Sequence, residues 1–146
     1  MSPEERKQRL QFIGLAESDS EMLRGLRTVL EAHLDQLDGE LEQHLQRFPA
    51  TAQLVPDPSR RESVRQARRA FLLRIADGRF DEEYFESRFQ LGRAHERVGL
   101  LPHWYLGANA VQLNLLAGLV FRQFAPDYQR IQDTLIALEK VFLLDA

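Results

Sequence analysis

The sequence contains no cysteine among its 146 residues. Disulfides, zinc–thiolate sites and metal centres held by a thiolate are therefore excluded, and a bound metal would have to use the four histidines or the carboxylates. The period-two alternation and hairpin turns of β-strands are also missing. No uninterrupted apolar run approaches the roughly 20 residues that span a membrane. We therefore expect a helical protein that does not cross a membrane.

Charge of neither sign dominates, with 19 Lys and Arg against 22 Asp and Glu and a net charge of −3. This balance argues against broad binding to nucleic acid or to anionic membranes. The N-terminal residues lack the character of a signal peptide. No Ser-His-Asp set, carboxylate pair or phosphate-binding loop occurs. Length and composition predict one cytoplasmic domain that is not itself an enzyme.

Apolar residues recur at spacings of three and four, which predicts an all-α protein of about seven helices. Ser18 and Ser59, each followed three residues later by a glutamate, are expected to open helices as capping boxes. Gly39 is expected to mark a break or a close helix crossing, Gly78 a helix end and Asp81 a helix cap. The segments predicted as helices are 1–16, 18–48, 60–76, 82–98, 103–124 and 127–145.

The stretch from residue 91 to residue 108 centres on His95 and follows the pattern G-x-x-H-x-x-x-G-L-x-P-x-W-Y-x-G-A. On a helix, His95 shares its stripe with the apolar residues Leu91 and Val98. A lone histidine on an apolar stripe is most often a core residue with one satisfied hydrogen bond. Gly92, one turn earlier, favours another interpretation, because a missing side chain lets a flat, bulky group approach the helix.

A helix end and a new helix start follow directly after this histidine. Gly99 is expected to end the helix, and Pro102 is expected to begin the next one. The resulting corner would bring Trp104 and Tyr105 beside His95. A histidine that binds a metal needs its second ring nitrogen to be oriented by a neighbouring group, and this corner supplies candidates.

The pattern resembles the proximal haem motif of the globin-coupled sensors and protoglobins. The likeness is densest over the last two-thirds of the chain, where residues 78–84 and 138–145 look like two further segments of that family. It implies a globin fold with an extra N-terminal helix over residues 1–17 and a sensor globin domain over residues 18–146. It also implies that haem b is bound, with His95 as the axial ligand of its iron.

The distal pattern of that family, F-Y-x-x-L-L-x-x-P, includes a tyrosine that donates a hydrogen bond to the gas ligand. Here Leu41 and Glu42 fall on the F-Y positions, so this tyrosine is missing. His44 as a sixth ligand and Gln66 as a donor are alternatives, but both are expected to face away from the iron. An apolar pocket of this kind is expected to bind CO or NO readily and oxygen weakly. The residues expected to line it are Leu41, Leu45, Phe48, Val64, Ala67 and Phe71 on the distal side and Leu91, Val98, Trp104 and Tyr105 on the proximal side.

One basic concentration occurs in the chain, and it consists of arginines. Arginine binds carboxylates bidentately, so one or two of these residues would pair with haem propionates, and the others would form a solvated helix face. The other histidines, His33 and His103, lack metal-ligand spacing. The arginines are Arg60, Arg61, Arg65, Arg68, Arg69 and Arg74.

The last two predicted helices carry more apolar residues than one core face needs, and exposed patches of this width usually mark an interface. The family resemblance implies a homodimer through helices 103–124 and 127–145. It also implies a C-terminal output domain, because the sequence stops in mid-pattern at residues 145–146. The apolar residues are Val111, Leu115, Leu119, Val120, Ile131, Leu135, Leu138 and Phe142.

The resemblance therefore implies a haem-binding input domain that senses O2, CO or NO for a bacterial-type signal transduction protein. Two alternatives remain open. One is a haem-free globin-fold interaction module of the stressosome-scaffold type, which would have no reason to keep the corner around His95. The other is a stand-alone oxygen binder resembling protoglobin, against which the truncated C-terminal pattern argues.

Overall fold

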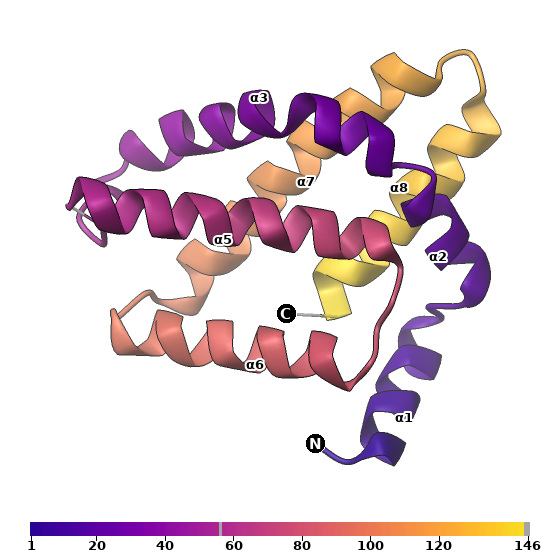
Figure 1. Ribbon diagram of the computed structural model, residues 1–146, viewed down its shortest axis with the longest axis horizontal. Helices are drawn as coiled ribbons and strands as arrows, with labels where there is room; N and C mark the ends of the chain where they lie inside the picture. Colours follow the sequence, from indigo (N-terminus) through magenta and orange to yellow (C-terminus); the bar gives the residue numbers. More distant parts are fainter. Residues whose placement is uncertain (56, 145–146) are drawn as a thin grey trace.

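The computed structural model describes residues 1–55 and 57–144, and within them the chain is helical with short connections and no strand. The helices are α1 (Pro3–Ile13), α2 (Glu17–Arg24), α3 (Arg27–Gln46), α4 (Pro49–Ala52), α5 (Pro58–Asp77), α6 (Glu82–Arg97), α7 (Pro102–Phe124) and α8 (Tyr128–Leu144). Figure 1 shows α3, α5 and α6 as three stacked rows, with α7 and α8 crossing behind them. The all-α prediction is confirmed.

One apolar core joins α2, α3, α5, α7 and α8. Helix α2 packs on α5 and α8, α3 packs on α5 and α7, and α7 packs on α8. Burying this many branched side chains is the main force that holds these five helices together. The deepest apolar side chains are Leu23, Leu26, Leu30, Ile75, Leu116, Leu119, Val120, Leu138 and Val141.

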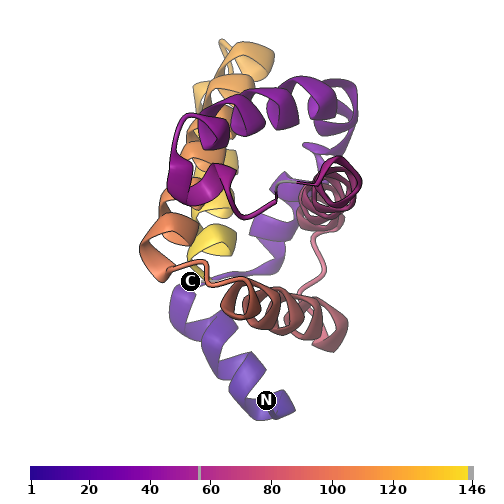
Figure 2. The same ribbon diagram turned by 90° about the vertical axis from the view of Figure 1, so that its left-hand side faces the viewer.

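Helix α6 meets this core at its N-terminal end, where Tyr84 is buried and Phe85 packs against it. Tyr84 is its one buried side chain, and in the described part of the chain its one close helix partner is α1. Figure 2 shows α6 as a separate row below α5. The helix starts as predicted, because the Asp81 carboxylate accepts a hydrogen bond from the Tyr84 N–H at 3.0 Å. Its apolar residues Leu91, Ala94 and Val98 are therefore not used by the core.

The first predicted capping box, at Ser18, is wrong. Helix α2 begins one residue earlier, and the carboxylate of Asp19 accepts a hydrogen bond from the Ala16 N–H at 2.9 Å. The predicted long helix is divided at Gly25 into α2 and α3. Gly39 neither breaks the helix nor marks a close crossing, since a Cβ there would meet no described atom within 4 Å.

The second predicted capping box, at Ser59, is also wrong. Asp57 caps α5 instead, with its carboxylate accepting a hydrogen bond from the Ser59 N–H at 3.0 Å. The short helix α4 was not predicted. Gly78 ends α5 as expected, with a left-handed φ of 65°. The last predicted helix matches α8, although its predicted end at Asp145 lies outside the described residues.

Candidate functional site

The predicted ligand, His95, is half-buried in the last turn of α6. Gly99 adopts a φ of 76°, and the Leu100 N–H donates to the His95 carbonyl at 3.0 Å, so the helix ends as predicted. Helix α7 begins at Pro102. Its first turns place the Tyr105 ring centroid 4.8 Å from that of His95, at an interplanar angle of 52°. The corner therefore brings this tyrosine to the histidine.

The surroundings of His95 favour its neutral form. Burial lowers the pKa of the His95 imidazole below its ordinary value of 6.5, and the positive charge of Arg88 lowers it further. The neutral imidazole is the form that binds a metal ion. Within residues 1–55 and 57–144, no group of three His, Asp or Glu side chains could hold a metal ion. An iron at this site would therefore depend on one imidazole and on the ligands of a cofactor.

Arg88, which the sequence analysis did not select, connects the histidine side of the site to α5. It lies at position i−7 relative to His95, two helical turns earlier on the same face of α6. Its Nη2 donates to the Tyr105 hydroxyl at 2.8 Å. Its guanidinium carbon lies 3.8 Å from the centroid of the Phe71 ring. The spacing from His95 is the one sequence feature that could have drawn attention to it.

The other predicted lining residues lie along α3, α5, α6 and the start of α7. The Phe48 ring centroid lies 6.1 Å from that of Trp104 and 5.3 Å from that of His44. Contacts thus join Phe48 with Trp104 across the two sides of the predicted site. Of the remaining residues, Leu41 is buried, Leu45, Phe71 and Leu91 are half-buried, and Val64, Ala67 and Val98 are exposed.

Contacts of Arg88 with Phe71 and of Arg74 with Glu83 bridge α5 and α6, and both helices also carry exposed apolar side chains. In the described part of the chain, these two helices are not among the closely packed pairs. Accordingly, Val64 on α5 is 36% exposed, and Val98 at the end of α6 is 46% exposed. A Cβ at Gly92 would meet no described atom within 4 Å, so protein packing does not require a glycine there. The neutral imidazole could coordinate a haem iron, and the apolar side chains could contact the porphyrin ring, so these residue types are compatible with a haem.

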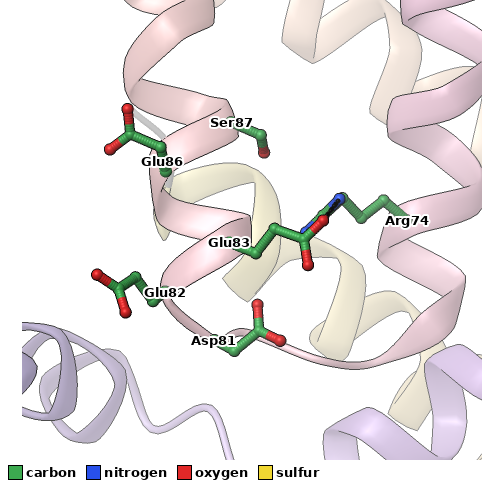
Figure 3. Close-up of a pocket in the computed structure, with 6 residues that line it drawn as sticks. All are labelled: Arg74, Asp81, Glu82, Glu83, Glu86 and Ser87. Carbon is green, nitrogen blue, oxygen red and sulfur yellow. Dashed lines mark hydrogen bonds and ion pairs between the residues drawn. The ribbon is translucent and has the colours of Figure 1, made fainter.

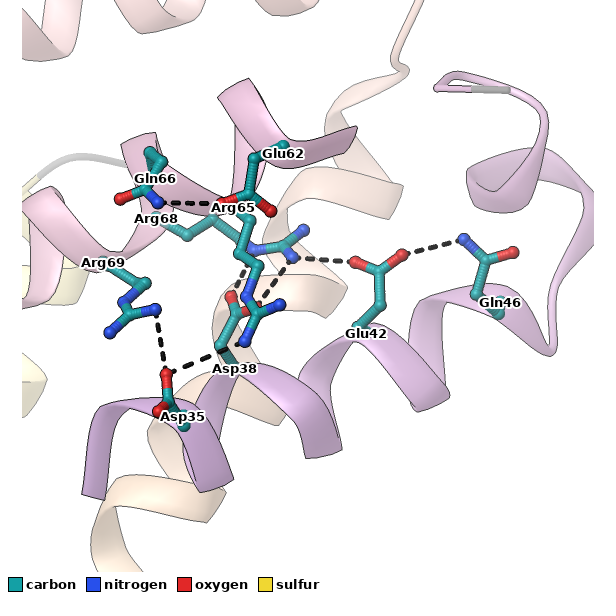
Figure 4. Close-up of polar contacts among 9 residues, drawn as sticks. All are labelled: Asp35, Asp38, Glu42, Gln46, Glu62, Arg65, Gln66, Arg68 and Arg69. Atoms are coloured by element: carbon teal, nitrogen blue, oxygen red, sulfur yellow. Dashed lines mark hydrogen bonds and ion pairs between the residues drawn. The ribbon is translucent and has the colours of Figure 1, made fainter. Parts of the chain in front are cut away.

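The position of the missing distal tyrosine belongs to an ion-pair network between α3 and α5 (Figure 4). Arg68 donates to the buried carboxylate of Asp38 at 2.8 Å and to Glu42 at 2.7 Å. Burial pushes the pKa of Glu42 upward, but hydrogen bonds from Gln46 and Arg68 and the charge of Arg68 outweigh it and leave the pKa below 4.5. Glu42 is therefore ionised at neutral pH and bound to α5.

Two further arginines of the basic run join the same network. Arg65 Nε lies 3.2 Å from the Asp38 carboxylate, and Arg69 lies 2.8 Å from that of Asp35. Arg74 pairs with a glutamate of α6. The expectation of a solvated helix face is wrong for these three and for Arg68, because each of them pairs with a carboxylate of a neighbouring helix. The pairing of an arginine of this run with a haem propionate stays a prediction.

The alternatives for the distal side face elsewhere or contact other groups. Gln66 is exposed and donates to Glu62 at 2.8 Å, as expected for a residue that faces away. His44 is half-buried against Phe48. His33 is half-buried, with its Nδ1 2.8 Å from a backbone carbonyl of its own helix. Gln66 thus faces away from the predicted pocket, whereas His44 contacts Phe48, one of the residues expected to line it.

An open depression at the corner between α5 and α6 is acidic (Figure 3). Arg74 and Glu83 point toward one another across it, at 3.4 Å. None of the predicted lining residues contributes to it, and an acidic rim does not suit a cofactor that carries carboxylates. Its lining residues are Arg74, Asp81, Glu82, Glu83, Glu86 and Ser87.

The predicted interface residues on α7 and α8 are partly wrong. Leu119, Val120, Ile131, Leu138 and Phe142 belong to the core of the chain itself, whereas Val111, Leu115 and Leu135 are half-buried. Periodicity identified apolar positions but could not show which face the core would use. Other apolar residues of the same helices are exposed, and we refer to them together as the α7–α8 stripe: Leu106, Phe121, Tyr128, Ile136 and Leu143.

Helix α7 is long and apolar enough, by length and composition, to cross a membrane. It passes this test although His103, Asn109, Gln112 and Asn114 interrupt its apolar residues, so it contains no uninterrupted apolar run of that length. The core helix of a soluble protein passes the same test, so the finding is weak evidence for a membrane. Only 17% of the most apolar 18-residue stretch of α7 is buried inside the chain. An apolar surface of this extent is typical of helices that a partner covers.

The order and packing of the described helices are those of a globin domain. The fold matches the globin domain of the Geobacter sulfurreducens globin-coupled sensor with a TM-score of 0.89, at 22% identity, over 95% of this chain and 91% of that one. A sequence model described as Protoglobin matches residues 2–146, and the chain belongs to that family.

A curated relative extends this comparison. The chain is 30% identical over 101 residues to the heme-based aerotactic transducer HemAT of Halobacterium salinarum. The match covers 68% of this chain and 21% of the transducer. The chain therefore spans about a fifth of the length of this relative.

Proposed function

We propose that this domain binds haem b through His95 and is the gas-sensing input part of a bacterial-type signal transduction protein. A haem iron held by one imidazole supplies a coordination position for a diatomic gas. The chain would supply that imidazole, the apolar side chains around the haem, and the surfaces of α7 and α8 through which a conformational change is transmitted. The likeness to the heme-based aerotactic transducer HemAT supports this class of function.

The observation that carries the proposal is the state of α6. This helix keeps an apolar face and a half-buried, neutral histidine, yet only Tyr84 is buried in the protein interior. Exposed apolar residues of α5 lie on the neighbouring helix. A haem between α5 and α6 would cover both faces and give His95 a function. A haem-free interaction module explains the apolar faces through a partner, but it leaves the neutral imidazole without a function.

The distal candidates point to weak oxygen binding. Leu41, Leu45, Val64, Ala67 and Phe71 cannot donate a hydrogen bond from their side chains. Glu42, at the expected tyrosine position, is bound to Arg68. Without a donor, oxygen should bind weakly or dissociate quickly, whereas CO and NO depend less on such a donor.

The exposed α7–α8 stripe supports a homodimer formed through these two helices. A twofold axis would place the same stripe of each subunit against its copy. Helix α8 is the last described element, and the relative's greater length is consistent with an output domain that follows it. A conformational change at His95 would then be transmitted through α7 and α8 to the output domain.

Absorption spectra of the purified protein test the proposal. The protein would be produced with ample haem, and the ferric, ferrous and CO-treated forms would be recorded for the wild type, His95→Ala and His33→Ala. We expect a Soret band in the wild type and in His33→Ala and its loss in His95→Ala. His33 is a matched control, because it is also a half-buried histidine on a helix. A colourless wild type, or full pigment in His95→Ala, would contradict the proposal.

A further inference from the structure

Arg88 holds two neighbouring helices at once. Its Nη2 donates to the Tyr105 hydroxyl on α7 at 2.8 Å, while its guanidinium plane covers the Phe71 ring on α5 at 3.8 Å. Only a planar guanidinium can stack on an aromatic ring and donate sideways at the same time. A hydrogen bond from a charged donor is also stronger than a neutral one. This hydrogen bond therefore holds the Tyr105 side chain at its hydroxyl end.

The other edge of Tyr105 meets the candidate iron ligand. Its ring centroid lies 4.8 Å from that of His95. Tyr105 thus lies between Arg88 and His95, which are two turns apart on the same face of α6. With the Arg88 hydrogen bond in place, Tyr105 would resist a movement of the imidazole. Without that hydrogen bond, the tyrosine would be free to move with it.

Beyond Phe71, the contacts continue to α8. The Phe71 and Phe142 ring centroids are 5.9 Å apart in an edge-to-face arrangement with an interplanar angle of 76°. Phe142 is 3% exposed and lies in the last turn of α8. A continuous row of side chains therefore runs from His95 through Tyr105, Arg88 and Phe71 to Phe142, and it joins four helices.

We propose that Arg88 is a positioning residue that sets Tyr105 against His95 and couples the setting of that imidazole to the end of α8. The inference rests on the proposed function, because His95 has to be the haem ligand for its setting to matter. Arg65, Arg68 and Arg69 do not offer this link, since they pair with carboxylates of α3. Arg88 is the arginine whose contacts join α5, α6 and α7.

The test uses two arms, and the first needs no haem. In the haem-free protein, urea unfolding followed by fluorescence of the single tryptophan would be measured for Arg88→Leu, Tyr105→Phe and the double variant. We expect the losses of stability to be non-additive, because both changes remove one hydrogen bond. Amide hydrogen exchange at residues 138–144 should become faster in Arg88→Leu. Additive losses together with unchanged exchange would overturn the coupling.

The second arm examines the histidine itself. In the ferrous haem-bound protein, resonance Raman spectroscopy reports the iron–imidazole stretch. We expect Arg88→Leu and Tyr105→Phe to shift it in the same direction and the double variant to shift it no further. Arg88→Lys keeps a charged donor but cannot stack on Phe71. We therefore expect the iron–imidazole band to return close to its wild-type position, while amide exchange in α8 stays fast. An unshifted band in Arg88→Leu would overturn the proposal while leaving haem binding intact.

Arg93→Leu is the matched control for both arms. Arg93 is an exposed arginine of the same helix, and its guanidinium lies 6.0 Å from the Phe89 ring. We expect neither the Raman band nor the exchange of α8 to change. Equal effects of Arg93→Leu and Arg88→Leu would reduce the result to lost charge and overturn the specific role of Arg88. A wild type that takes up no haem would instead refute the proposed function, and the first arm would still decide whether Arg88 couples to α8.

Discussion

In the proposed haem site, position 67 is where α5 could be given a side chain that donates a hydrogen bond to a bound gas. Ala67 is exposed on the stripe that also carries Val64 and Phe71. We expect Ala67→Gln to slow oxygen dissociation by about tenfold to a hundredfold, since a hydrogen bond to a charged acceptor contributes about 1.5–3 kcal/mol. The acceptor is the bound oxygen molecule, which acquires a partial negative charge as a ligand. Stopped-flow measurement of oxygen dissociation would check the expectation.

The adjacent residue provides the control for this change. Gln66 already carries an amide, but it is exposed and donates to Glu62, so Gln66→Ala should leave the dissociation rate unchanged. If Gln66→Ala accelerated dissociation as strongly as Ala67→Gln slowed it, the assignment of faces on α5 would be wrong. A slowly dissociating wild type would show that a donor already exists.

At the same scale, the sequence could predict one half of the site but not the other. His95 and Tyr105 lie within a single corner, so the positions of Gly99 and Pro102 were enough to bring them together. Arg88 contacts Phe71, which lies on another helix, and no local rule relates those two positions. The arginine run misled for a similar reason, because the carboxylates that pair with Arg65, Arg68 and Arg69 lie one helix away on α3.

At the scale of helices, the buried carboxylate of Asp38 holds α3 and α5 together. Its side chain is 4% exposed, and that of Arg68 is 19% exposed. Removing one partner of a buried pair leaves an uncompensated charge. We expect Arg68→Ala to lower the free energy of unfolding by about 3 kcal/mol, at the low end of the range for buried pairs, because Arg65 also contacts Asp38. Urea unfolding of the haem-free protein, followed by circular dichroism, would measure it.

Arg69→Ala is the comparison for this element. Arg69 makes a contact of similar length, but its partner Asp35 is 76% exposed. An exposed pair contributes about 1 kcal/mol or less, so Arg69→Ala should cost clearly less than Arg68→Ala. Losses of equal size in the two variants would show that the burial of Asp38 does not control the strength of this contact.

Helix starts show what local sequence can and cannot specify. Asp81 was predicted correctly because no other capping side chain competes with it. Ser59 was not, because Asp57 lies two residues earlier and a carboxylate accepts a hydrogen bond from a backbone N–H more strongly than a hydroxyl does. Ser18 was not, because the helix begins at Glu17 and Ser18 lies inside it. The division at Gly25 follows from packing, since Leu23 and Leu26 both become fully buried on either side of the bend. Such tertiary effects are not visible in helical periodicity.

For the whole molecule, the sequence predicted the helical class and the family fold, while the outer surface remained ambiguous. Periodicity marks apolar positions on α7 and α8, but it cannot divide them between the core and a partner. The core takes Leu119 and Leu138, and residues such as Phe121 and Ile136 remain exposed. The family resemblance predicted the fold because the family has a known order and packing of helices, which periodicity alone does not provide.

The α7–α8 stripe leads to the last prediction. We expect the protein to be a dimer and Ile136→Glu to make it a monomer, as measured by analytical ultracentrifugation at micromolar concentration. Ile136 is 37% exposed near the middle of α8, and a twofold interface would bring two copies of the new charge into an apolar contact. Phe89→Glu is the control, because Phe89 is 61% exposed but lies on α6. It should remain dimeric, and dissociation of both variants to the same extent would place the interface elsewhere.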